Sequence, residues 1–265
     1  DIQLTNYSYI FLYDIKQLLN NRIQSYLTDQ IKWIQLQKVD VKKYGISLPF
    51  LKYVALVYHI NDIIQGQTIE VIDNMLITLS QELFTWLTNI SNQNIKYSDI
   101  FKLKNLCYYE VTLTNISQST IPSLKKFISY VISQRIEVES RYIVWMVSYE
   151  FPSLSDLAVR LEGVGNRVRE EELALYIRRK DVQNVVKELD LKTLESSITT
   201  MRKRLEKHCD NTDDQDLKLL SDLWKKIKDK TVDIVKKLEL AALVSYQITL
   251  DIGPQIVAAT FDKFS

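Results

Sequence analysis

Apolar side chains recur every three or four residues along most of the chain, which is the spacing of one face of an α-helix. The first stripe predicts a long helix that ends near Gln37. We therefore expect an all-α fold that opens with one amphipathic helix, followed by a loop over residues 39–48. The stripe consists of Phe11, Ile15, Leu18, Leu19, Ile23, Tyr26, Leu27, Ile31 and Ile34.

The segment after Pro49 is apolar nearly all round. Proline suits the first turn of a helix, where its missing N–H has no partner to lose. We expect residues 50–64 to form a buried central helix, because a helix without a polar face is normally enclosed. Further helices are predicted over residues 69–90, 99–116 and 122–149.

The last 115 residues show clearer apolar stripes, with positions three and four apart. We call each such stripe along one face of a helix a seam. Helices are predicted over residues 152–168 and 181–189, and a short one after Gly253 and Pro254. Two long helices between them should pack as an antiparallel hairpin across an Asp-rich loop at residues 210–214. Their seams are Leu191, Leu194, Ile198, Met201 and Leu205, then Leu220, Trp224, Ile227, Thr231, Ile234, Leu238 and Ala241.

Composition changes near Phe151 and Pro152, where aromatic residues become rare and charged residues more frequent. We therefore expect two units, a first helical bundle at residues 1–150 and a C-terminal helical bundle at residues 151–265. Helices of 20 to 35 residues span roughly 30–50 Å at 1.5 Å per residue. The expected architecture is an elongated rod of two stacked antiparallel helical bundles.

Composition excludes several classes of protein. Only 5 Gly and 4 Pro occur in 265 residues, too few for a Gly-rich phosphate loop or a many-stranded sandwich. The net charge of +1 gives no general attraction to nucleic acid. No apolar segment reaches the ~20 residues that cross a bilayer, and no signal peptide is visible. The chain does not begin with Met, so we expect a fragment of something longer.

Candidate chemistry is scarce. His208 and Cys209 form the one adjacent pair of metal-competent residues, but zinc normally takes four ligands, so we expect a solvated helix end. The Asp-rich loop lacks the central Gly and terminal Glu of a calcium-binding EF-hand. The carboxylates of Glu170, Glu171 and Glu172 point in different directions on a helix and cannot converge on one bond. We predict no enzyme, no cofactor and no metal.

Lysines are densest over residues 225–237, and Lys225, Lys228 and Lys236 mark a possible binding face. Three interpretations stay open: a solvated face, a protein partner, or a peripheral module that contacts anionic lipids. Acidic residues four positions before Lys226 and Lys237 favour a solvated face with ion pairs. No aromatic residues alternate with the lysines, which argues against nucleic acid.

Several ordered segments resemble the C-terminal region of the exocyst subunit that carries an N-terminal PH domain. Leu161-Glu162-Gly163-Val164 with Arg167-Val168 is similar to the family's F-E-G-V-x-x-R-V. Gly163 should allow a close helix approach or a bend. Other matching segments are Arg169-Glu170-Glu171-Glu172 with Leu173 and Tyr176, Val185 to Glu188, Leu205 to His208, Leu219-Leu220 with Trp224, and Gly45 with Leu48-Pro49-Phe50. Residues 241–245 and Gly253-Pro254 depart from the family's pattern.

The resemblance implies a non-enzymatic subunit built of stacked helical rods. It implies that eight exocyst subunits assemble side by side and hold secretory vesicles at the plasma membrane before fusion. The partners would be other exocyst subunits, and the location would be cytoplasmic with recruitment to the inner face of the plasma membrane. Small-GTPase and phosphoinositide binding would belong to the PH domain upstream of this chain.

Overall fold

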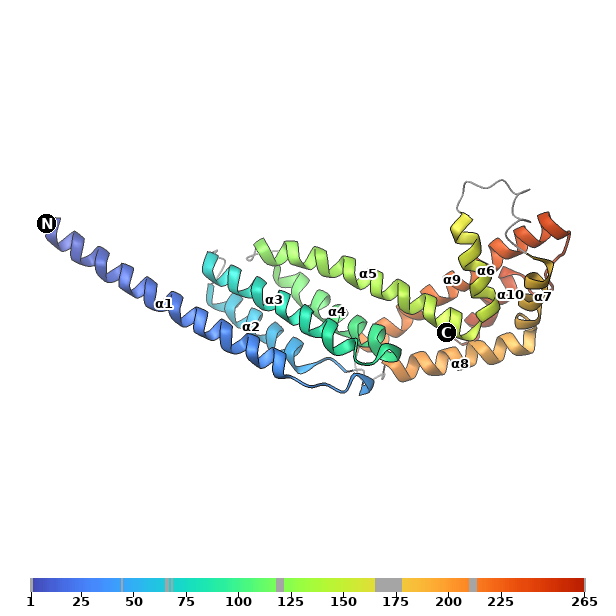
Figure 1. Ribbon diagram of the computed structural model, residues 1–265, viewed down its shortest axis with the longest axis horizontal. Helices are drawn as coiled ribbons and strands as arrows, with labels where there is room; N and C mark the ends of the chain where they lie inside the picture. Colours follow the sequence, from blue (N-terminus) through green and yellow to red (C-terminus); the bar gives the residue numbers. More distant parts are fainter. Residues whose placement is uncertain are drawn as a thin grey trace. The chain divides into compact units, whose positions relative to one another are not determined.

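The computed structural model describes residues 2–43, 45–64, 67, 69–117, 122–164, 178–209 and 214–264. Within these ranges the chain forms ten α-helices, one short 3₁₀-helix and no strand (Figure 1), which confirms the all-α prediction. The elements are α1 (Ile2–Leu36), η1 (Val41–Lys43), α2 (Leu48–Ile64), α3 (Glu70–Ser91), α4 (Ile95–Ser117), α5 (Pro122–Glu150), α6 (Pro152–Val164), α7 (Arg179–Glu188), α8 (Leu191–Cys209), α9 (Asp214–Tyr246) and α10 (Pro254–Asp262).

All four prolines lie in the first turn of a helix, as the sequence predicts. Pro122, Pro152 and Pro254 are the first residues of their helices, and Pro49 is the second residue of α2. At this position the fixed φ of proline fits the helix and no intrahelical hydrogen bond is lost. The prolines therefore set where four helices begin.

The chain divides into two compact units, Asp1–Val138 and Glu139–Ser265. The division falls inside α5, whereas composition placed a boundary at Phe151 and Pro152, where α5 ends. Composition shows where the kinds of residue change along the chain. The boundary between compact units depends instead on which helices pack together.

The core of the first unit is aromatic and lies between α2, α3 and α4. Tyr53 stacks on Tyr109 with ring centroids 5.7 Å apart, and Phe84 meets Tyr109 edge-on at 5.2 Å. Ser80 joins the two phenols, because its hydroxyl donates to Tyr53 at 2.6 Å and lies 2.9 Å from the Tyr109 oxygen. The Tyr53 hydroxyl in turn donates to the carbonyl of Leu76 at 3.1 Å.

Burial makes these two phenols weaker acids than an exposed tyrosine. Loss of solvent raises the pKa of Tyr53 to about 12 and holds the pKa of Tyr109 well above its usual value. Both side chains are therefore neutral donors at physiological pH, and their shared hydrogen bonds fix how the three helices meet.

The prediction that residues 50–64 form a buried central helix is wrong for one side of α2. Phe50, Tyr53, Val54 and Val57 face α3 and α4 and are buried. On the other side Tyr58 is 41% exposed and Ile63 is 78% exposed. The neighbouring helices cover one face of α2, and its charged residues lie on the other face beside Tyr58 and Ile63.

In the second unit α8 and α9 pack against each other, as their seams predict. Leu194, Ile198, Met201 and Leu205 of the α8 seam are fully buried. The carboxylate of Glu188 accepts hydrogen bonds from the backbone N–H groups of Ser153 and Leu154, at 2.9 and 3.1 Å. It thereby caps the start of α6, where a carboxylate complements the positive helix end.

Candidate interaction surfaces

The N-terminal half of α1 has almost no cover within its own unit. Figure 1 shows it running past the ends of α2 and α3. The large apolar side chains between residues 7 and 19 are all exposed, from Tyr7 at 75% to Ile15 at 38%. They are Tyr7, Tyr9, Ile10, Phe11, Leu12, Tyr13, Ile15, Leu18 and Leu19.

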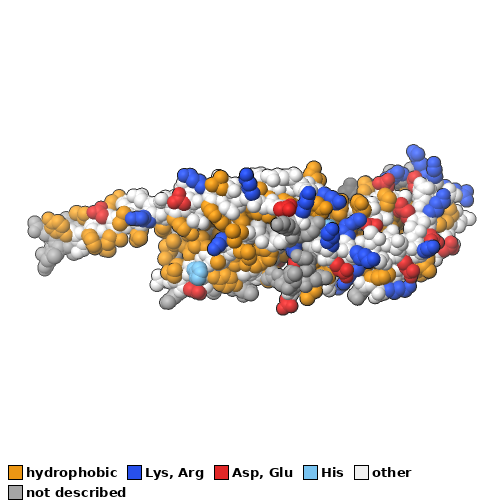
Figure 2. Space-filling model, turned by 90° about the horizontal axis from the view of Figure 1, so that it is seen from below, with side chains coloured by type: hydrophobic (Ala, Val, Ile, Leu, Met, Phe, Trp, Pro, Cys, Tyr) orange, Lys and Arg blue, Asp and Glu red, His pale blue; other side chains and the backbone are white. Residues whose placement is uncertain are grey.

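These side chains surround the helix rather than forming one stripe, because successive helical residues turn by 100°. Ile10, Phe11 and Leu12 alone point in three different directions. A helix that is apolar all round is stable in water only when neighbours enclose it on several sides. Figure 2 shows hydrophobic side chains along this segment. We name residues 7–19 the free segment of α1.

The free segment continues a contact that already exists in this unit. The C-terminal half of α1 packs on α3, and Ile34 there is buried. The indole N–H of Trp86 in α3 donates to the carbonyl of Gln37 at 3.1 Å. Where α3 begins, a groove of about 730 Å³ opens between the helices, lined by Lys16, Leu19, Asn20, Ile23, Ile69, Glu70, Val71, Ile72 and Asn74.

The predicted lysine face lies on α9, but acidic residues neutralise much of it. α9 carries seven lysines and six acidic residues. Lys228 pairs with Asp262 at 2.6 Å, and Lys237 pairs with Asp233 at 2.8 Å, as the spacing predicts. Lys225 and Lys236 are exposed. A helix of nearly balanced charge has little general attraction for anionic lipids.

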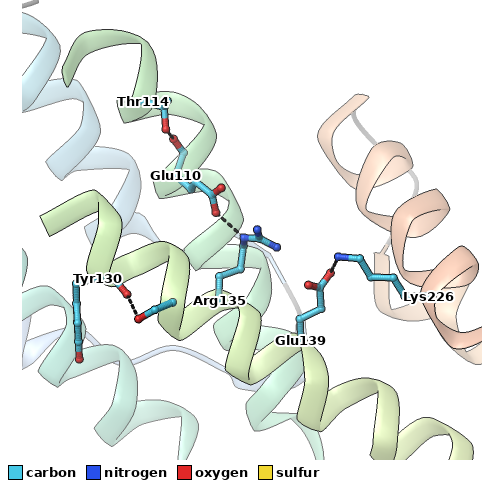
Figure 3. A network of polar contacts seen from close by, with 7 residues as sticks. Glu110, Thr114, Tyr130, Arg135, Glu139 and Lys226 are labelled. Atoms are coloured by element: carbon cyan, nitrogen blue, oxygen red, sulfur yellow. Dashed lines mark hydrogen bonds and ion pairs between the residues drawn. The ribbon is translucent and has the colours of Figure 1, made fainter. Parts of the chain in front are cut away.

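The predicted partner of Lys226 is wrong. Its ammonium lies 2.6 Å from the carboxylate of Glu139 in α5 (Figure 3), instead of pairing with Asp222 one turn away. The Glu139 side chain is only 7% exposed and needs a partner more than an exposed Asp does. Four residues earlier in α5, Arg135 pairs with Glu110 of α4 at 2.5 Å, within the first unit (Figure 3).

His208 and Cys209 do not form a solvated helix end. His208 is 4% exposed and Cys209 is fully buried. Nδ1 of His208 lies 2.7 Å from the Tyr142 hydroxyl, and its ring stacks on Trp145 with centroids 6.4 Å apart. The sequence carries no sign of this, because α5 and α8 are far apart in the chain. Among the described residues no cluster of three metal-binding side chains occurs.

Arg204 completes this cluster. Its guanidinium lies 4.0 Å from the ring centroid of Tyr149 and 2.7 Å from the carboxylate of Glu150. Burial raises the pKa of Glu150, and the charge of Arg204 opposes that rise. The cluster joins α5 to α8 through buried aromatic and charged side chains, which is the arrangement of a structural contact.

The comparisons with known proteins decide the family. A family model described as exocyst complex component Sec3, C-terminal, matches residues 1–247. The chain belongs to this family. That result confirms the resemblance seen in the sequence.

One relative of Sec3 type is exocyst complex component SEC3A of Arabidopsis thaliana. It is 24% identical over 227 residues, which cover 84% of this chain and 25% of the relative. The chain therefore spans about a quarter of the length of that relative. No solved structure matches the chain. Sec3 is a non-enzymatic exocyst component, which agrees with the prediction that the chain is not an enzyme.

Of the residues that carry the resemblance to the Sec3 family, some lie in the core and others lie outside the described residues. Trp224 lies in α9 and is 4% exposed, so it belongs to the core of the second unit. Glu162, Gly163 and Val164 end α6, and their side-chain surroundings lie outside the described residues. Arg169, Glu170, Glu171 and Glu172 also lie outside the described residues. The proposed role of Gly163 in a close contact stays a prediction.

Asp214, the last residue of the predicted Asp-rich loop, belongs to a helix instead. Asp214 and Asp216 lie in the first turn of α9, where negative charge complements the helix dipole. Asp210 and Asp213 lie outside the described residues. In the part of the chain that the structure describes, no helix has the length and hydrophobicity of a membrane span.

Proposed function

We propose that the chain is part of a non-enzymatic exocyst subunit that tethers secretory vesicles to the plasma membrane before fusion, by packing with other exocyst subunits. Membership of the Sec3 family supports this. In this proposal the subunit is cytoplasmic and is recruited to the inner face of the plasma membrane at exocytic sites. The two helical units act as stacked rigid rods that hold binding surfaces apart.

The observation that carries the proposal is the free segment of α1. Its large apolar side chains would be exposed to water unless other helices enclosed them, and burying one such side chain contributes about 1.5–3 kcal/mol. Apolar patches of this extent on soluble proteins normally mark protein interfaces. Because the segment is apolar all round, we propose that it lies inside a bundle whose other helices come from the assembled complex.

Two substitutions in the full-length subunit test this proposal. Phe11 and Leu18 are 65% and 60% exposed, so Phe11→Glu and Leu18→Glu should not disturb the fold of the first unit. In an enclosed helix each would bury a charge, which is strongly unfavourable. We expect the other exocyst subunits to be lost from affinity-purified complexes and secretion to fall.

Ile95→Glu is the matched control, because Ile95 is 89% exposed at the first residue of α4. A glutamate there complements the helix dipole and should leave the complex intact. If complexes carrying both Phe11→Glu and Leu18→Glu kept all their subunits and secreted normally, the free segment would not be an interface.

A further inference from the structure

A cleft in the second unit, distinct from the free segment of α1, has the chemistry of a binding site. It has a volume of about 450 Å³ and lies where α8, α9 and α10 meet. Three cationic side chains line it against a single carboxylate, so an anionic group is favoured inside it. The lining consists of Arg202, Leu217, Leu220, Ser221, Trp224, Lys225, Lys228 and Asp262.

Arg202 is held in place beside this cleft. Its guanidinium carbon lies 5.2 Å from the ring centroid of Trp224, and Trp224 is backed by Phe261 with ring centroids 5.0 Å apart. Nε of Arg202 pairs with Glu206 at 2.8 Å. The two Nη groups are left for a ligand, and a fixed guanidinium fork matches a carboxylate well.

Trp224 supplies the second observation. Its side chain lines the cleft and is 4% exposed, yet its indole N–H finds no acceptor among the described residues. A buried donor without an acceptor is destabilising, because it has lost its hydrogen bond to water. A ligand oxygen that reached this N–H would supply the missing acceptor.

The remaining lining indicates what kind of anion fits. Leu217 is 48% exposed at the cleft and Leu220 lies one turn along the same face. Lys228 forms an ion pair with Asp262 at 2.6 Å, and Lys225 is exposed at the rim of the cleft. An apolar contact therefore lies next to the donors, which suits a side chain next to a carboxylate better than a lone phosphate.

We propose that this cleft binds a short peptide segment of a partner protein in which a carboxylate side chain lies next to a large aliphatic side chain. Arg202 and Trp224 bind the carboxylate, Lys225 attracts it, and Leu217 and Leu220 receive the aliphatic side chain. A flat lipid surface is disfavoured, because the Arg202 and Lys228 side chains are only 21% and 24% exposed. Acidic motifs bound by arginine are a common mode of peptide recognition.

The test uses the 265-residue chain and a fluorescein-labelled peptide of four Glu-Leu repeats, with four Gln-Leu repeats as the uncharged counterpart. Charge-assisted hydrogen bonds are worth about 1.5–3 kcal/mol. We therefore expect the Gln-Leu peptide, and the variant Arg202→Gln, to bind at least ~10-fold more weakly in fluorescence anisotropy. In NMR spectra of the chain with ¹⁵N-labelled tryptophan, the Trp224 indole resonance is the one that is absent from the spectrum of Trp224→Phe. This resonance should shift when the Glu-Leu peptide is added.

Lys236→Gln is the matched control, because Lys236 is an exposed lysine of α9 outside the cleft. It should bind the peptide as the unchanged chain does, whereas Lys225→Gln should bind it more weakly. Lys225 is exposed, so this variant tests the cleft even if Arg202→Gln fails to fold. Equal affinity for both peptides, or no saturable binding below about 1 mM, overturns the proposal. Binding to phosphatidylserine vesicles that needs Arg202, without peptide binding, also overturns it and assigns the cleft to lipid.

Discussion

The hydroxyl of Tyr142 and Nδ1 of His208 are 2.7 Å apart, and they join α5 to α8 across 66 residues of sequence. Both side chains are almost completely buried. Breaking this hydrogen bond is costly, because a buried polar atom that loses a hydrogen bond does not regain solvation.

Tyr142→Phe should therefore destabilise the second unit by about 1–2 kcal/mol, since the hydrogen bond to Nδ1 of His208 would be lost. Urea unfolding followed by tryptophan fluorescence measures this, because Trp145 stacks on His208. Tyr149→Phe is the control: Tyr149 belongs to the same aromatic cluster but is 56% exposed. Equal stability of the two variants would show that the hydrogen bond contributes nothing.

Alkaline pH should destabilise the first unit. The pKa of Tyr53 is about 12 in the folded chain against 10.0 when solvated, so the unfolded chain loses its proton first. The contribution of Tyr53 to the free energy of unfolding is then fully present below pH 10. It is lost as the pH rises towards 12, by about 3 kcal/mol in all. Urea unfolding between pH 8 and 12 measures the fall, and Tyr53→Phe should reduce it. An unchanged alkaline fall in that variant would contradict this assignment.

Ser80→Ala tests the same hydrogen bonds at neutral pH. The substitution removes the hydroxyl that lies between Tyr53 and Tyr109, and Tyr109 then lacks that partner. We expect a loss of about 1–3 kcal/mol in the free energy of unfolding of the first unit. Thr85→Ala is the control, because the Thr85 hydroxyl is exposed and bonds only within its own helix. A loss no larger than in this control would count against a role for Ser80.

The ion pair of Lys226 and Glu139 should be measurable by a double-mutant cycle. Lys226→Met leaves the buried Glu139 carboxylate without this cation, whereas the double variant with Glu139→Gln leaves no such charge. We expect a coupling energy of about 1 kcal/mol, because Lys226 is half exposed and solvent weakens the interaction. Lys236→Met should show no coupling with Glu139→Gln.

The rod expected from the helix lengths is a prediction that small-angle X-ray scattering can test. A compact protein of 265 residues has a radius of gyration of about 18 Å. Stacked bundles should give a clearly larger value and a skewed distance distribution. The variant carrying Phe11→Glu and Leu18→Glu is suited to this measurement, since it should associate less with itself. A radius of gyration near the compact value would rule out the rod.

The helices were predictable from the sequence because their signals are local. Three- and four-residue spacing, proline at helix starts and the α8 seam all depend on residues within a few turns of one another. The family was equally accessible, because its motifs are runs of adjacent residues such as Glu162-Gly163-Val164. These features survive in the sequence without any knowledge of which helices touch.

The contacts that could not be predicted from the sequence join residues that are far apart in the chain. His208 looks like a solvated helix end until Tyr142 and Trp145 of α5 are placed against it. Lys226 pairs with Glu139, 87 residues away, rather than with the acid one turn before it. Both sides of α2 carry large apolar residues, although its charged residues all lie on the exposed side, and only the packing of α3 and α4 shows that Tyr58 and Ile63 are left uncovered. The cleft at Arg202 likewise combines three helices.

The free segment of α1 has a consequence for any copy of the subunit that fails to assemble. Nine large apolar side chains between residues 7 and 19 would then stay in contact with water. Molecular chaperones and the degradation machinery recognise exposed runs of this kind. The same helix that would hold an assembled subunit in place would therefore mark an orphaned one for removal, and so keep its abundance matched to that of its neighbours.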